Sequence, residues 1–210
     1  MRARRARGQR GAVAVEAALI TPLLVLLLLG IVEMALLMRD VVSVNSAVRV
    51  GARVASAAAG AGPGVCVAGS NPPPCTPANA PAFAQAAADA IQRSGTAMPQ
   101  DSIQSIMVFE ANTAGFPLPE GNSTLTCSTH CVTYVWDAAL NRFRFGAGSW
   151  PSTSVNACVN SPAQDTVGIV LNARHSWVSG LFGSGFSISE RSVMRFEPLP
   201  TEQCLPGTHL

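Results

Sequence analysis

The sequence contains no lysine and has little charge of either sign. Charged residues make up 12% of its 210 positions, aromatic residues 6%, and all fourteen positive charges are arginine. Six arginines flank one apolar run, at Arg2, Arg4, Arg5, Arg7, Arg10 and Arg39. The formal net charge is only +2, and nothing in the remaining positive charge looks like a nucleic-acid-binding surface.

Recognisable catalytic motifs are also missing. A triad of His175, Asp165 and a serine has no G-x-S-x-G turn to present a nucleophile, so a structural role for His175 beside Trp177 is preferred. The stretch GLFGSG at 180–185 lacks the strand-then-helix setting of phosphate loops and predicts a hairpin or loop. We therefore expect neither enzymatic activity nor a cofactor.

The cysteines all follow the apolar run and are even in number, which favours an oxidising compartment and up to three disulfides. They are Cys66, Cys75, Cys127, Cys131, Cys158 and Cys204. Pairing of Cys66 with Cys75 is the most plausible single bridge, although fifteen connectivities are possible and scattered buried thiols are an alternative. Zinc binding by the CSTHC stretch is disfavoured, because its spacing is not that of a zinc ribbon.

Residues 12–38 form a candidate transmembrane helix. AALITPLLVLLLLGIV at 17–32 is uninterrupted, and the longer run is broken only by Glu16 and Glu33. At about 1.5 Å per residue, it supplies the ~20 residues that cross a ~30 Å hydrocarbon core. Five arginines precede it and one follows closely, so the positive-inside rule places the N-terminus in the cytoplasm and the rest outside.

A cleaved secretory signal is the competing interpretation of this run. The sequence continues with helical character after it, however, and the nearest small-residue cluster, Ala55 to Ala59, comes too late for a signal cleavage site. Apolar residues then recur every three or four positions from Val41 to Ala59. This spacing predicts one helix from about 13 to about 59, ended by the Gly/Pro loop at 60–64.

The exported part is predicted to be an α+β domain. PAFAQAAADAIQRSG predicts a helix over 82–94 that ends at Gly95. β-Branched and aromatic residues predict strands at 102–111, 131–138, 141–147, 165–177 and 186–198. Short connections favour an antiparallel sheet, against which the long helix would lay its apolar stripe, as in a pilin.

Two stretches carry a family resemblance. RGAVAVEAALITPLLVLLLLGIVEMALLMRD, followed by VNSAVRVGARVAS, is similar to the TadE family of the tight-adherence (Flp) pilus system, and so is the closing SISERSVMRFEP at 187–198. A basic leader, a glycine, four residues, a glutamate and an apolar helix also resemble the class III signal of type IV pilins and pseudopilins. The resemblance implies cleavage between Gly11 and Ala12 by a prepilin peptidase.

Three costly residues of the apolar helix are candidate assembly residues. If the chain is cut after Gly11, the new Ala12 amine is largely cationic at neutral pH, and Glu16 could pair with that amine on a neighbouring subunit. Pro22 should kink or loosen the helix, with or without an assembly role. Glu33 is either an interfacial residue that reaches headgroups or water, or a contact to another subunit.

These observations predict a basic cytoplasmic leader (1–11), a transmembrane helix (12–38), its extension (39–59) and an exported disulfide-bonded domain (60–210). The resemblance implies a minor pseudopilin-like structural component of a tight-adherence pilus or related secretion machine. Its expected partners are pilus subunits, Tad inner-membrane assembly proteins, a prepilin peptidase and the lipid bilayer. The alternative is a single-pass membrane protein whose exported domain binds a ligand or surface without a filament role.

Overall fold

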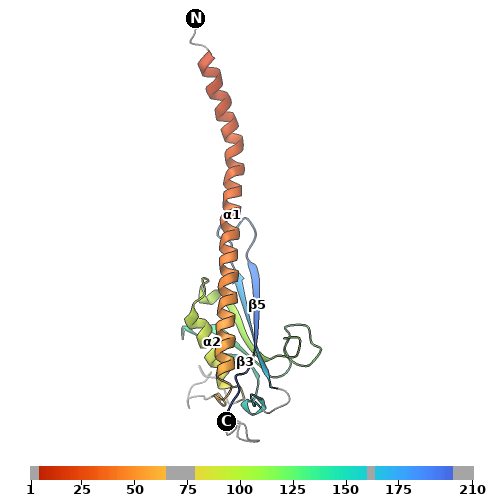
Figure 1. Ribbon diagram of the computed structural model, residues 1–210. Coiled ribbons are helices and arrows are strands. Elements are labelled where there is room, and N and C mark those ends of the chain that lie inside the picture. The colour runs from red at the N-terminus through yellow and green to blue at the C-terminus, as the bar shows by residue number, and fades with distance from the viewer. Residues whose placement is uncertain (1–4, 65–78, 160–163, 201–210) are drawn as a thin grey trace.

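The computed structural model describes residues 5–64, 79–159 and 164–200, with side chains described from residue 11 onward. It combines one long N-terminal helix, α1 (Arg5–Ala57), with a second helix and a five-stranded sheet gathered around the C-terminal half of α1 (Figure 1). The N-terminal half of α1 projects away from this domain. The predicted α+β, pilin-like architecture is confirmed.

Helix α1 ends where the sequence predicts but begins earlier. It stops at Ala57, ahead of the turn that leads to Gly62, whose positive φ of 74° suits glycine. Its start at Arg5 brings part of the predicted basic leader (1–11) into the helix, whereas the predicted helix began near residue 13. The apolar pattern marked only the segment with an apolar run or a buried stripe. Helix propagation needs neither and continues through arginine, a good helix former.

Pro22 lies inside α1, which continues on both sides of it. Proline cannot donate the hydrogen bond that the carbonyl of Ala18 would otherwise accept. The hydroxyl of Thr21, which directly precedes Pro22, donates a hydrogen bond to the Ala17 carbonyl at 2.7 Å. The many remaining backbone bonds of a 53-residue helix sustain it across this single gap.

Helix α2 (Ala82–Ser94) has the predicted bounds. Pro81 precedes its first turn, and Gly95 ends it with a φ of 69°. Its apolar face is fully buried and consists mostly of alanine, which lets α2 approach α1 closely. That face comprises Phe83, Ala84, Ala87, Ala88, Ala90 and Ile91.

The sheet contains β1 (Ile103–Glu110), β2 (Cys131–Asp137), β3 (Arg142–Ser149), β4 (Thr166–His175) and β5 (Phe186–Arg195). Its spatial order is β3-β2-β1-β4-β5, and every neighbouring pair is antiparallel, as predicted. Short 3₁₀ turns at Gln100–Ser102 and Ser152–Ser154 precede β1 and follow β3. Strands β4 and β5 form a hairpin whose connection, residues 176–185, we call the hairpin tip.

The core lies between the sheet and the two helices. Helix α1 packs on α2, β4 and β5, and α2 packs on β2 and β3. Gly51 marks the closest approach, because a Cβ there would stand 2.7 Å from Ile91 Cδ1 and 3.2 Å from Ile169 Cδ1. At the end of the domain farther along α1, Phe83 makes edge-on contacts with Trp150 and Phe196, each at 5.2 Å between ring centroids.

Candidate functional site

The predicted processing and assembly residues lie on the part of α1 that the domain leaves uncovered. Ala12, Glu16 and Pro22 are exposed, and nothing lies within 4 Å of the position that a Gly11 Cβ would take. Gly11 and Ala12 are six and seven residues from the start of the helix at Arg5. The bond between them therefore lies about two turns into the helix.

Glu33 lies instead where the domain first meets α1. Only 2% of its surface is exposed, and its two carboxylate oxygens accept hydrogen bonds from the backbone N–H groups of Val178 (3.1 Å) and Ser179 (2.5 Å). Both donors belong to the hairpin tip, about 145 positions further along the chain. The structure therefore gives Glu33 an intramolecular partner.

A second carboxylate, Asp40, holds the same hairpin two helical turns further on. Its Oδ2 lies 2.7 Å from His175 Nδ1, and its Oδ1 accepts from the Arg39 guanidinium at 3.0 Å. Asp40 and His175 are 5% and 3% exposed, whereas the Arg39 side chain is 56% exposed. The His175 ring also makes an edge-to-face contact with the Trp177 ring, at 4.9 Å between ring centroids. We call Glu33, Asp40, His175 and the tip amides the carboxylate seam.

Seven residues separate Glu33 from Asp40, so the two carboxylates share one face of α1. The buried stripe of α1 continues that face as Leu37, Val44, Ala47, Val48, Gly51, Ala52, Ala55 and Ser56. Sequence reasoning began the stripe at Val41 and missed the role of Asp40. Two acidic residues at heptad spacing on an otherwise apolar face were the signal that could have revealed it.

His175 therefore has a different partner from the one a catalytic triad would need. It ends β4, while Asp165 directly precedes β4, so the two lie at opposite ends of a ten-residue strand. At about 3.3 Å per residue, that strand keeps them roughly 30 Å apart. This separation excludes the triad of His175 and Asp165.

Asp165 belongs to a polar cleft at the end of the domain away from the hairpin tip. The cleft has a volume of about 640 Å³, and its wall includes Glu110, Asn112, Glu120, Asp165 and Arg195. Burial raises the pKa of Asp165 to about 6, helped by the nearby Glu110 charge and opposed by the Asn156 N–H, which donates to its Oδ2 at 2.6 Å. Next to it, His130 Nδ1 lies 2.5 Å from Glu110 Oε2.

The cysteines that the structure describes are oxidised. Cys127 and Cys131 form a disulfide with a Cα separation of 6.3 Å, which closes the CSTHC stretch, and Cys158 is also disulfide-bonded. Cys66, Cys75 and Cys204 lie outside the described residues, and so does their expected pairing. Within the described ranges, no group of three or more histidine, cysteine or acidic side chains is placed to hold a metal ion.

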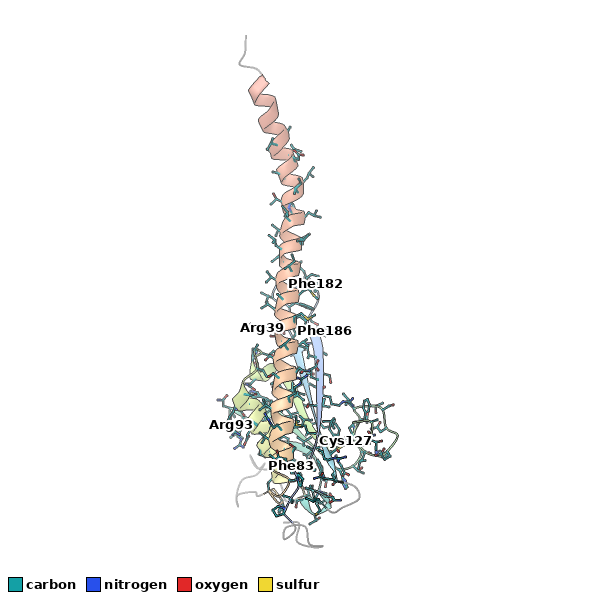
Figure 2. All side chains as sticks on the ribbon, in the orientation of Figure 1. Arg39, Phe83, Arg93, Cys127, Phe182 and Phe186 are labelled. Carbon is teal, nitrogen blue, oxygen red and sulfur yellow. A yellow bond between two sulfur atoms is a disulfide. The ribbon has the colours of Figure 1, made fainter. Side chains whose placement is uncertain are left out.

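Outside α1, exposed large apolar side chains gather around the hairpin tip. Val178 is 78% exposed, Leu181 and Phe182 are each 56% exposed, and Phe186 at the start of β5 is 51% exposed. Figure 2 shows Phe182 and Phe186 beside α1, on the side of the domain from which the uncovered helix projects. Among the described residues, α1 is the one helix that is long and apolar enough to cross a membrane.

Comparison with known proteins finds a match for most of α1 but none for the domain that follows it. No curated protein and no solved structure matches the chain. The sequence model of one family, described as TadE-like protein, matches residues 11–53. The match starts at Gly11, covers Glu16, Pro22, Glu33 and Asp40, and ends two residues after Gly51. Residues 11–53 of this chain are therefore a TadE-like family domain.

Proposed function

We propose that this chain is a minor pseudopilin-like structural component in the assembly of a tight-adherence pilus or a related secretion machine. The observation that carries the proposal is the TadE-like domain at 11–53, joined to a pilin-like arrangement of helix and sheet. In this proposal, α1 anchors the chain in the cell membrane, with the arginine-rich leader in the cytoplasm and residues 39–210 outside. Pilus subunits and Tad inner-membrane assembly proteins are the proposed partners.

A prepilin peptidase removes the leader in this proposal. Residues 1–11 leave with the cut after Gly11, and the apolar helix remains in the bilayer with Ala12 as its first residue. Mass spectrometry of the protein from cells with and without a working prepilin peptidase tests this step. A mature chain that begins at Ala12 only when the peptidase is present supports processing, and an intact Met1 leader in both cells contradicts it.

Glu16 then has a chemical reason to lie in the bilayer. The free portion of α1 leaves its carboxylate exposed, where an ammonium group of a neighbouring subunit can reach it. A carboxylate and an amine that meet in a low-dielectric region offset part of each other's burial cost and fix the axial offset between two parallel helices. Glu16 is thus proposed to register the subunit within the assembly.

The registration role is tested by pilus assembly in cells that express Glu16→Gln in place of the wild-type chain. Removal of the charge at nearly constant volume should reduce surface pili, whereas the matched Glu197→Gln change, at an exposed position of the domain, should not. Equal piliation in wild-type and Glu16→Gln cells would show that this carboxylate has no assembly role.

The polar cleft supports a second candidate function, that of a membrane-anchored domain that binds a ligand or surface without a filament role. Its carboxylates, the Arg195 side chain and a volume of about 640 Å³ suit a small polar ligand. The two functions differ in the phenotype of deletion. Loss of pili supports the first, and normal pili with loss of surface attachment support the second.

A further inference from the structure

The hairpin tip has the composition of a membrane-contacting loop. Its sequence, SWVSGLFGSG, contains no charged residue. Within the described residues outside α1, seven large apolar side chains are exposed, and three of them lie on this ten-residue tip, with Phe186 directly after it as a fourth. Single exposed apolar residues are ordinary on soluble surfaces, but a cluster of them marks an interaction surface.

The tip lies beside the end of the predicted membrane-spanning run. Phe182 Cζ stands 3.9 Å from the position that a Gly30 Cβ would take, and Glu33 accepts the tip's backbone bonds one turn later. Between tip and helix is an almost wholly apolar groove of about 410 Å³. It is lined by Leu27, Gly30, Ile31, Met34, Trp177 and Phe182.

The length of α1 places this groove at the membrane boundary. At about 1.5 Å per residue, residues 12–32 span roughly 30 Å, the thickness of the hydrocarbon core. Residue 30 then lies in the last turn of that core, and Arg39, with its exposed side chain, lies about 13 Å further out. Trp177 falls between these two levels, where tryptophan is enriched in membrane proteins.

From this placement we infer that the hairpin tip is a second membrane contact, which enters the extracytoplasmic lipid interface beside α1 with lipid acyl chains in the groove. The inference rests on the membrane anchoring in the proposed function. Leu181 and Phe182 supply the apolar surface that enters the acyl region. Leu27 and Ile31 belong both to the groove and to the lipid-facing surface of α1. Lipid that covers this surface of α1 can therefore also fill the groove.

The Glu33 contact explains how a loop can enter this layer. Backbone N–H groups that leave water without a partner cost several kcal/mol each in hydrocarbon. Glu33 accepts two of the tip's N–H groups, from Val178 and Ser179. The carboxylate and the amides thus satisfy each other at the depth where neither has much water.

The test is quenching of Trp177 fluorescence by lipid. The full chain is reconstituted in phosphatidylcholine vesicles whose acyl chains are brominated, and its emission is compared with that in unbrominated vesicles. The other tryptophans, Trp136 and Trp150, pack against Phe143 and Phe83 within the domain. We expect bromine to quench an emission component that is present in the wild-type chain and missing from Trp177→Phe.

A pair of matched variants tests the tip itself. Phe182→Asp should lower the Trp177 quenching by at least about two-fold, because a charge is costly below the interface. Val159→Asp introduces the same charge at a side chain that is 67% exposed and far from the tip, and it should leave the quenching unchanged. Equal quenching in Phe182→Asp and wild type would overturn the inference.

Extraction with alkaline carbonate separates failure of this inference from failure of the anchor. Release of the wild-type chain from the vesicles would refute membrane anchoring and, with it, the proposed function. Retention of the chain, with no bromine-sensitive difference between wild type and Trp177→Phe, would refute only the tip contact. If shielding of Trp177 from aqueous iodide then rises with the protein-to-lipid ratio, a second copy of the chain occupies the groove in place of lipid.

Discussion

Removal of the Asp40 carboxylate should loosen the domain from α1. Asp40 and His175 are almost fully buried and lie 2.7 Å apart, so Asp40→Ala leaves a buried imidazole N–H without its acceptor. The other ring nitrogen, Nε2, is also buried, and no described residue bonds it. Breaking a buried pair by removing one partner costs about 3 kcal/mol, which lowers the Tm by roughly 6–12 °C for a chain of this size.

The assay is thermal unfolding of the full chain in detergent, followed by tryptophan emission. Arg39→Ala is the matched control, because it removes the neighbouring side chain, which is half exposed and whose ion pair contributes at most about 1 kcal/mol. Asp40→Asn keeps the volume and one acceptor oxygen and should fall between the two. A Tm for Asp40→Ala no lower than that for Arg39→Ala would refute the reasoning.

A double-mutant cycle isolates the pair from general damage to α1. His175→Phe removes the imidazole that Asp40→Ala leaves unpaired, so the double variant should be more stable than the sum of the two single changes by about 1–2 kcal/mol. Additive losses would show that Asp40 and His175 stabilise the domain independently.

Three further changes test other parts of the fold. Gly51→Leu should lower the free energy of unfolding by about 3 kcal/mol, because even a Cβ would stand 2.7 Å from Ile91; a denaturant midpoint equal to that of the wild type would contradict this close packing. Gly168→Val should be at least as damaging, because its Cβ would overlap the Phe109 ring, and soluble expression is the simplest measure; normal yield and Tm would refute the overlap. For Asp165, the raised folded pKa of about 6 means that the folded state holds the proton more tightly than the unfolded state, so wild-type stability falls as pH rises from about 4 to about 6. The Tm of Asp165→Asn relative to wild type should therefore rise over that interval and stay level above it, and a constant difference would exclude this linkage.

Much of the fold could be predicted from local signals. The bounds of α2 follow from Pro81 and Gly95, which mark its start and end, and the strands follow from runs of β-branched and aromatic residues. Such signals act within a few positions of the residues they describe. The resemblance at Gly11 and Glu16 was likewise carried by a short stretch of sequence, and the family match at 11–53 covers both residues.

The carboxylate seam could not be predicted in the same way. Glu33 and its tip amides are about 145 positions apart, and they meet only because the sheet order places the β4–β5 hairpin along α1. From the sequence, Glu33 is a charge near the end of an apolar run, and its environment depends on which strand pair covers that helix face. The apolar hairpin tip was likewise predicted only as a loop. Its position beside Gly30 and Glu33 of α1 depends on the tertiary fold and could not be predicted from local sequence.

The carboxylate seam also shows which face of α1 the domain covers, so the directions of other side chains around the helix axis can be compared with it. Glu16 precedes Glu33 by seventeen residues, and at about 100° per residue its side chain points roughly 100° away from the face that the domain covers. In the proposed assembly, a neighbouring helix that pairs with Glu16 would therefore approach α1 beside the face that the domain covers. Under the proposed function, this angle of about 100° between Glu16 and Glu33 would set the side of the domain on which the next subunit lies.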